Sequence, residues 1–222
     1  YSTIYAYNAD VLGDNPPTTI ADLFDTATWP GKRGLQKSAF VNMEWALLAD
    51  GVPMDEVYDV LSTEEGIARA FAKLDTIKGS VVWWEAGAQP PQLLSDGEVV
   101  MTSAWNGRIY GAVKNEGKNF VIVWDAQGFD FDYLAIPKGT PRLDTAYDFL
   151  AYARAPENMA RQSQFISYGP VHVDAIPHIP ADILKDLPTA PENSENVLYV
   201  DSYWWADNRE DMEKRFAAWL AQ

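Results

Sequence analysis

Apolar residues recur along this chain with two periods, that of a strand in some segments and that of a helix in others. Short runs rich in β-branched and aromatic residues, bounded by Gly, Pro, Asn or Asp, are typical of strands. They predict strands over residues 3–7, 81–84, 99–104, 120–124 and 133–136. Helix-like segments lie between most of these runs, and the alternation predicts an α/β fold.

The helix-like segments are recognised by apolar residues three or four positions apart and by the residues at their ends. Thr63, followed by Glu64 and Glu65, is typical of an N-cap with an acidic first turn. Gly51 is suited to end the preceding helix. The pattern predicts helices over residues 19–24, 42–50, 63–74, 156–165 and 208–220, helices that begin at Pro90 and Pro141, and a short helical turn near Ile183.

Two of these helices carry apolar faces that we expect to be buried. In the last helix this face consists of Met212, Phe216, Trp219 and Leu220. In the helix after Pro141 the residues expected to face inward are Leu143, Ala146, Phe149 and Leu150. Turns and loops are predicted at residues 8–10, 29–33 and 166–170 and over most of 174–196.

The composition is that of a globular chain with a sizeable core. Of the 222 residues, 47% are hydrophobic, and no apolar run approaches the roughly 18 to 20 residues that a membrane span needs. The 17 basic and 32 acidic residues give a net charge of −15, which argues against nucleic acid or an anionic membrane as a partner. The charge is compatible with a cationic ligand, although an acidic surface that aids solubility accounts for it better.

Several classes of reactive site are absent from the sequence. No cysteine is present, which excludes disulfides, thiolate nucleophiles and zinc–thiolate sites. His172 and His178 are six positions apart in a Pro-rich loop, a spacing that does not indicate a metal site. No nucleophile elbow, phosphate-binding loop or dinucleotide fingerprint appears. The first seven residues lack the basic and apolar regions of a signal peptide, so we expect none within this chain, whether or not one has been removed.

The most specific motifs lie between Trp83 and Pro170. In order they are Asp96-Gly-Glu-Val99, Trp105-Asn-Gly107, Leu134-Ala-Ile-Pro-Lys-Gly139 and Ile166-Ser-Tyr-Gly-Pro170. Each motif is weak alone. Together, at this spacing, they resemble the bacterial extracellular (periplasmic) solute-binding proteins of ABC importers, and among these the spermidine/putrescine-binding group. The resemblance extends from Tyr7 to the last helix.

The resemblance implies a bilobed architecture of the type II periplasmic binding proteins, whose two α/β lobes close around a ligand by hinge motion. Members of the family are longer than this chain, so we expect mostly lobe two and a partial lobe one. Residues 1–128 are predicted as lobe two, 129–170 as the hinge strand and return into lobe one, and 171–222 as a C-terminal loop and helices that pack on lobe two. The first third of the family's length would be clipped, absent or supplied by a separate chain. The returned segment would then lack sheet neighbours.

Three residues are the first candidates for ligand contact. The resemblance implies that Trp105, which precedes a tight turn, stacks on the ligand, where an indole face gains about 0.5 to 2 kcal/mol from a cation. It also implies that Asp132 pairs with a ligand ammonium group and that Tyr168 lines the cleft. Structural roles are the alternatives: a cap on the core for Trp105, local backbone hydrogen bonds for Asp132 and hinge packing for Tyr168.

A second group of candidates combines flat aromatic surface with charge. Trp84, Glu85 and Gln89 precede or enter a turn of small residues that a ligand could approach closely. Trp204 and Trp205 occupy a segment where the resembled proteins place a polar cleft residue. The alternatives are strand packing for Trp84 and packing of the last helix for the other two tryptophans.

The chain departs from the polyamine-binding pattern in two places. Asp130 stands where that group has a second stacking tryptophan. Ser38 and Val41 replace a pair of acidic residues, and whether Glu44, one turn further on, substitutes for them is left open. These differences weaken the case for a long polyamine and favour a shorter amine, a quaternary ammonium compound or an amino acid-like solute. Arg108 is either an anion contact or a surface residue.

The sequence therefore predicts the solute-binding component of an ABC importer, with no catalytic residues and no cofactor. It would capture a small cationic nitrogen compound, a polyamine or related amine, in the periplasm and deliver it to a permease in the inner membrane. The alternative is a carbohydrate-binding protein or a glycoside hydrolase that uses a Trp-rich cleft. A pure interaction module would explain the acidity but not the ordered motifs.

Overall fold

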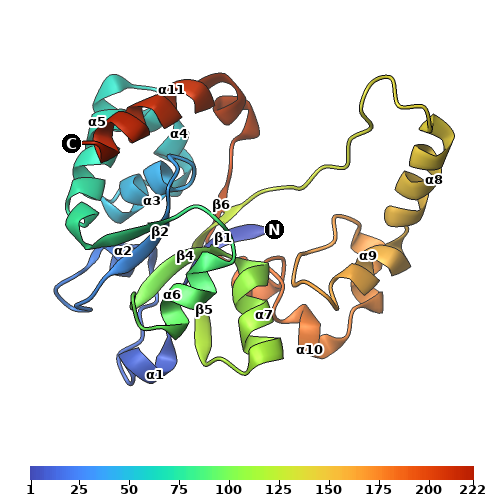
Figure 1. Cartoon of the computed structure of the whole chain (residues 1–222), viewed down its shortest axis with the longest axis horizontal. Helices are drawn as coiled ribbons and strands as arrows, with labels where there is room; N and C mark the ends of the chain where they lie inside the picture. Colours follow the sequence, from blue (N-terminus) through green and yellow to red (C-terminus); the bar gives the residue numbers. More distant parts are fainter.

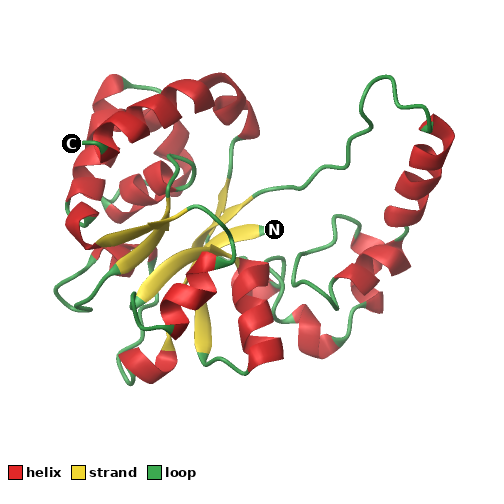
Figure 2. Ribbon diagram, in the orientation of Figure 1, coloured by secondary structure: helices red, strands yellow, loops and turns green.

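Six strands form one mixed sheet with helices on both faces (Figures 1 and 2). The computed structural model describes residues 1–222. In spatial order the strands are β3 (Val81–Trp84), β2 (Arg33–Gln36), β4 (Met101–Trp105), β1 (Ser2–Asn8), β5 (Phe120–Phe129) and β6 (Val197–Tyr199). The predicted α/β class is confirmed.

The helices follow the strands along most of the chain. The α-helices are α1 (Ala9–Leu12), α2 (Ile20–Phe24), α3 (Asn42–Ala49), α4 (Val57–Leu61), α5 (Glu64–Asp75), α6 (Gln89–Ser95), α7 (Asn106–Glu116), α8 (Leu143–Ala153), α9 (Pro156–Gln162), α10 (Ala181–Leu184) and α11 (Ser202–Leu220). Short 3-10 helices are η1 (Met54–Glu56), η2 (Lys78–Ser80), η3 (Val173–His178) and η4 (Pro191–Asn193).

Strand β1 lies inside the sheet and is antiparallel to both of its neighbours. Its register pairs Thr3 with Trp105 of β4 and Ser2 with Phe129 of β5. The other neighbouring strands are parallel to each other. Strand β1 therefore begins at the edge of the sheet where the other five strands end. We call this edge the carboxyl edge.

The two faces of the sheet are covered by separate apolar cores, and β1 contributes to both because its side chains alternate. Tyr5 and Tyr7 face the larger core, which includes residues of α2, α3, α5 and α11. Ile4 and Ala6 face the smaller core, with α6 and α7. Figure 1 shows these two groups of helices on either side of the strands.

Strand β2 was not predicted, since residues 29–33 have the composition of a loop. Arg33 is fully buried, and its guanidinium donates four hydrogen bonds of 2.8 to 2.9 Å to backbone carbonyl groups between residues 23 and 31. Gly34 allows β2 to approach β4, because a Cβ atom there would lie 2.1 Å from Thr102 Oγ1. Both features depend on distant segments, so no local pattern indicates them.

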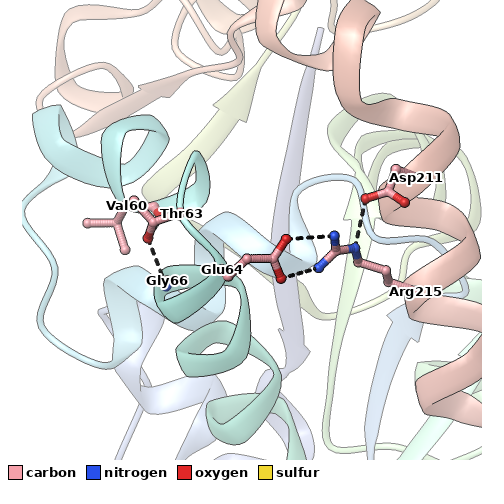
Figure 3. Close-up of polar contacts among 6 residues, drawn as sticks. All are labelled: Val60, Thr63, Glu64, Gly66, Asp211 and Arg215. Atoms are coloured by element: carbon pink, nitrogen blue, oxygen red, sulfur yellow. Dashed lines mark hydrogen bonds and ion pairs between the residues drawn. The ribbon is translucent and has the colours of Figure 1, made fainter.

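The junction of α4 and α5 is tightly packed (Figure 3). Thr63 Oγ1 accepts a hydrogen bond from the Gly66 amide at 3.0 Å, which confirms the predicted N-cap. Gly66 lies directly on α4, because a Cβ atom there would be 1.9 Å from the Val60 carbonyl oxygen. Only glycine lets the two helices meet at this distance.

Exposed polar contacts join α11 to α5 (Figure 3). Glu64 accepts two hydrogen bonds from the Arg215 guanidinium, at 2.7 and 2.8 Å, and Asp211 accepts a third at 2.7 Å. Such surface pairs contribute little net stability. The Glu64–Arg215 pair connects α5 to α11, whereas the Asp211–Arg215 pair lies within α11.

Several predicted boundaries are wrong by a few residues or more. Helix α11 begins at Ser202 rather than Asn208, because Asp201 caps it by accepting hydrogen bonds from two amides of the first turn. Residues 8–10, predicted as a turn, cap and begin α1. Strand β5 continues to Phe129, and α4, α7 and β6 were not predicted. Asn106 and Gly107, expected to form a tight turn, begin α7 instead.

The segment after β5 also differs from the prediction. Residues 133–136 form no strand, because no strand in this chain lies beside them to pair with their backbone groups. They belong to the long connection that leads to α8 (Figure 1). The predicted inward face of α8 is wrong as well: none of its residues is buried, and Leu143 and Phe149 are 47% and 57% exposed.

A third, small core lies beyond α8. It is formed by Ala160, Ala175, Ile179, Ile183 and Leu187. These residues come from α9, η3, α10 and the turns beside them, and α10 confirms the short helix predicted near Ile183. None of the helices combines the length and the apolar character needed to cross a membrane.

We expect Gly66→Ala to lower the free energy of unfolding by about 1–3 kcal/mol, because the new methyl group would overlap the Val60 carbonyl and push α5 away from α4. Gly79→Ala is the matched control, since no atom lies within 4 Å of its Cβ position. Urea unfolding followed by circular dichroism measures both. Equal stability of the two variants would contradict this packing.

Candidate functional site

The candidate site lies at the carboxyl edge of the sheet. After β2 the chain turns to α3 on the face of the larger core, and after β4 it turns to α7 on the opposite face. When the chain leaves two neighbouring parallel strands toward opposite faces of the sheet, a crevice forms between the strand ends. Ligands usually bind in this crevice in open α/β sheets. The residues just beyond the strand ends that belong to this edge are Lys37, Ser38, Glu85, Asn106 and Asp130.

Asn106, the first residue of α7, joins three segments at this edge. Its side-chain Oδ1 accepts a hydrogen bond from the Ser2 amide at 3.0 Å, and its Nδ2 donates to the Ser167 carbonyl oxygen at 2.6 Å and to Ser167 Oγ at 3.2 Å. All three residues are fully buried. Asn106 therefore fixes the loop that carries Tyr168 against the beginning of α7.

Two glycines let larger side chains approach the first turn of α7. A Cβ atom at Gly107 would lie 2.8 Å from the Tyr168 ring. A Cβ atom at Gly87 would lie 2.3 Å from the Trp105 ring and 3.3 Å from Arg108 Nε. Trp105, Arg108 and Tyr168 thus surround the same helix terminus, although they come from distant parts of the sequence.

Carboxylates approach this cluster from the segment after β5. Asp130 Oδ2 accepts a hydrogen bond from the Tyr1 hydroxyl at 3.3 Å, and the Tyr1 and Tyr168 ring centroids are 5.6 Å apart. Burial raises the pKa of Tyr168; the charge of Asp132 raises this pKa further, and Arg108 opposes both effects. Tyr168 therefore lies within electrostatic reach of one acidic and one basic side chain.

A cavity of about 810 Å³ opens beside this cluster. Twelve of its 20 lining residues are hydrophobic. The lining comes from the segment after β5, from α8 and α9, from residues 168–171 and 188–194, and from β6. Its polar groups include Asp132, Arg154, Gln162 and Tyr168. A largely apolar pocket with a small number of placed polar groups is typical of small-molecule sites.

The structure brings together the three residues that the sequence placed first. Asp132 and Tyr168 line the cavity, and Trp105 lies beside Arg108 at the start of α7. Asp132 is exposed, whereas Trp105 and Tyr168 are half-buried. The contact of these residues with a ligand stays a prediction.

Trp84 supports this cluster from behind. It is fully buried, its indole donates to Ser103 Oγ at 3.1 Å, and its ring stands at right angles to that of Trp105 with the centroids 5.8 Å apart. A ligand at this edge cannot reach it while Trp105 covers it. Its place in the structure corresponds to strand packing, the alternative given above.

Glu85 and Gln89 shape the turn after β3. Gln89 Oε1 accepts hydrogen bonds from the amides of Glu85 and Ala86, at 2.8 and 2.7 Å. The exposed Glu85 carboxylate forms an ion pair with Lys37 across the edge, at 2.8 Å. Both side chains are engaged with this chain, and neither lines the cavity.

Trp204 and Trp205 lie in the first turn of α11 and pack toward the larger core. Trp205 is buried and donates to Glu44 Oε1 at 2.6 Å. Trp204 donates to Ser62 Oγ at 3.0 Å, and its ring packs on Tyr58 with the centroids 5.6 Å apart. Neither lines the cavity. Glu44 lies beneath Trp205, so it does not stand in for the acidic pair missing at residues 38 and 41.

The joining role of Asn106 and the close contacts of Gly87 and Gly107 were not predicted from the sequence. The Trp-Asn-Gly motif contained a signal for the role of Asn106, because the side chain of an asparagine at a helix start has one hydrogen-bond acceptor and two donors for contacts with other segments. Its partners, Ser2 and Ser167, are 104 and 61 positions away and could not be deduced. No group of three His, Asp or Glu side chains is arranged to hold a metal ion.

Comparison with known proteins gives a consistent result. A model of the family described as bacterial extracellular solute-binding protein matches residues 1–192. A gamma-aminobutyric acid-binding protein from Pseudomonas aeruginosa is 46% identical over all 222 residues. The chain spans 62% of the length of that relative.

Two solved structures share the fold over nearly the whole chain. One is the PBP MotA from A. tumefaciens B6 in complex with glucopine, with a TM-score of 0.90 and 36% identity over 99% of this chain and 69% of the other. The second is the Atu4243–GABA receptor, with a TM-score of 0.87 and 36% identity over 100% of this chain and 67% of the other. The predicted fold class, that of part of a type II periplasmic binding protein, is confirmed.

We expect Asn106→Ala to lower the free energy of unfolding by about 2–4 kcal/mol, because the buried Ser2 amide and Ser167 carbonyl would lose their partners. The loop that carries Tyr168 should also become more accessible to protease. Asn115→Ala, at an exposed position of the same helix, is the control. The joining role is wrong if both variants unfold at the same urea concentration and are cleaved at equal rates.

Proposed function

Because the chain belongs to the bacterial extracellular solute-binding protein family, we propose that it forms the solute-binding part of an ABC importer component. The solute would bind at the carboxyl edge, beside Trp105, Asp132 and Tyr168. One observation carries this proposal: Trp105 and Tyr168 lie at the first turn of α7, and Tyr168 lines the cavity together with Asp132. An indole face, a carboxylate and a phenol are suited to hold a small amine without reacting with it.

We propose further that the solute is a small amine that also carries a carboxylate. Asp132 offers a partner for the ammonium group. Arg108 offers one for the carboxylate, because its side chain is exposed beside Tyr168 and forms no ion pair in the structure. In a chain with 32 acidic residues, an arginine without an acidic partner is free for a planar, two-point contact with an anion.

The names of the relatives support a solute of this kind. Gamma-aminobutyric acid, which the 46% identical relative is named for, has one ammonium and one carboxylate group. The loss of acidic residues at positions 38 and 41, with Glu44 buried, also removes the partners that the far end of a long polyamine would need.

A sugar-binding or glycoside-hydrolase function is not favoured. It required a cleft lined by many tryptophan side chains, but Trp45, Trp84 and Trp205 are buried in the protein. The relatives are named as binding proteins or receptors, not as hydrolases.

The proposed partners follow from the family. A permease in the inner membrane would receive the solute from this protein in the periplasm. A further polypeptide segment would complete lobe one, because α8 buries none of its residues and leaves Tyr147 and Tyr152 each 59% exposed. Aromatic side chains presented on a helix in this way are typical of a surface that another element covers.

We expect Trp105→Ala and Asp132→Asn each to weaken binding of gamma-aminobutyric acid by tenfold or more, on the order of 1.4 kcal/mol, without loss of fold. The first removes the stacking surface and the second the negative charge for the ammonium group. Titration calorimetry of the purified protein measures the effect. Asp144→Asn, at an exposed position of α8, is the control. Unchanged affinity in both test variants would refute the assignment of the site.

Arg108→Gln distinguishes an amino acid from a diamine. We expect it to weaken gamma-aminobutyric acid binding by tenfold or more, while the affinity for putrescine, which has no carboxylate, stays equal or increases. Arg142→Gln, an exposed arginine that also lacks an ion pair, is the control. Thermal-shift titrations with both ligands give the comparison. An equal loss for the two ligands would contradict a carboxylate contact at Arg108.

A further inference from the structure

Glu44, in the first turn of α3, is a buried acid that the proposed solute site does not use. Its residue is 0% exposed. Its Oε1 accepts hydrogen bonds from the Tyr58 hydroxyl at 3.0 Å and from the Trp205 indole at 2.6 Å. Its second oxygen, Oε2, is buried and has no hydrogen-bond partner. A buried carboxylate oxygen without a donor is costly, so this residue calls for an explanation.

The groups around Glu44 do not neutralise it. From α4 it meets only the Tyr58 hydroxyl, and from α11 the Trp205 indole. On α11 the Arg209 guanidinium lies over the Trp205 ring, 5.5 Å from its centroid, and forms no ion pair with Glu44. The Asp201 side chain caps α11 instead. When it is ionised, Glu44 therefore has no ion-pair partner.

Burial raises the pKa of Glu44 to about 7, although the hydrogen bonds from Trp205 and Tyr58 lower it. The carboxyl is therefore protonated below neutral pH and charged above it. The protonated form needs no countercharge in the apolar core, whereas the charged form does.

Glu44 is connected to the segment that leads into α11. The Tyr58 hydroxyl, which donates to Glu44, also accepts a hydrogen bond from the Asp201 amide at 3.0 Å. Residue 201 lies two positions after Tyr199, the end of β6, whose side chain lines the cavity. The Trp205 indole donates to the Glu44 carboxyl directly, and the Asp201 amide is connected to it through the Tyr58 hydroxyl. These contacts hold residues 201–205 in place.

We propose that Glu44 is a positioning residue for the candidate site: its buried carboxyl holds residues 199–205 at the carboxyl edge and releases them when it loses its proton. The holding of this segment is independent of any solute. Only its consequence, that solute affinity falls as the pH rises above neutrality, rests on the function proposed above.

The direction of the pH effect follows from the two states of the carboxyl. In an opened segment the carboxyl is hydrated and has an ordinary pKa near 4.5, whereas in the closed structure the pKa is about 7. The closed state therefore binds the proton more tightly. Its stability relative to the open state is greatest at acidic pH and is lost as the pH rises through neutrality. Linkage gives a loss of about tenfold in the closing equilibrium between pH 6 and pH 8.

Hydrogen–deuterium exchange of the purified protein without solute tests this proposal. After correction for intrinsic exchange, we expect the protection of residues 199–205 to fall about tenfold from pH 6 to pH 8. Residues 67–74 of α5 serve as an internal reference for global unfolding. In Glu44→Gln, which cannot ionise, protection should be equal at both pH values. Glu65→Gln, an exposed carboxylate on α5 that forms no ion pair, should retain the wild-type pH dependence.

Tyr58→Phe provides a second test that does not require Glu44→Gln to fold. It retains the ring but removes the hydroxyl between Glu44 and the Asp201 amide, so protection near residue 201 should fall at both pH values. The proposal is overturned if wild-type protection at 199–205 changes no more than that of the α5 reference, or if Tyr58→Phe exchanges like wild type. Loss of solute binding with normal exchange behaviour would instead count against the proposed function.

Discussion

The pairing of β1 with β4 and β5 is the constraint on which the rest of the structure depends. Strand β1 is buried from Ser2 to Tyr7, so its backbone groups must be paired within the sheet, and the alternation of its side chains fills both cores. A shift by one residue would exchange the two sets of side chains between the cores. The register that avoids this places Thr3 opposite Trp105 and Ser2 opposite Phe129. The same register therefore aligns the beginning of α7 with the segment that carries Asp130 and Asp132.

Buried polar side chains support the carboxyl edge from two sides. On the side of α7, Asn106 satisfies the Ser2 amide and the Ser167 carbonyl, and it has no unpaired group of its own. On the side of α3 and α11, Glu44 gathers two donors but keeps one oxygen without a partner. A fully hydrogen-bonded amide such as Asn106 connects its segments over a wide pH range. The stability of a connection through a buried, incompletely paired carboxyl such as Glu44 depends on whether the carboxyl is protonated.

Burial is distributed unevenly along the chain, and this unevenness corresponds to the proposed function. The sheet and the helices on its two faces form well-packed cores, whereas α8 and the connection before it leave large apolar side chains in contact with solvent. The cavity lies between these two regions and takes its walls from both. A site assembled in this way can change shape when the less tightly packed region moves, which a protein that takes up and releases a solute requires.

The sequence by itself determined the α/β class, the N-cap at Thr63 and the short helix near Ile183, and its motifs, through the family resemblance, singled out Trp105, Asp132 and Tyr168 as candidate contacts. These depend on local periodicity, on capping residues and on motifs that are contiguous in the chain. Tertiary structure alone decided that β2 is a strand, that residues 133–136 are not, and that Trp84, Trp205 and Glu44 are buried supports. A strand exists only where another strand offers hydrogen bonds, and a side chain is buried only where distant residues cover it. Neither condition is present in a local stretch of sequence.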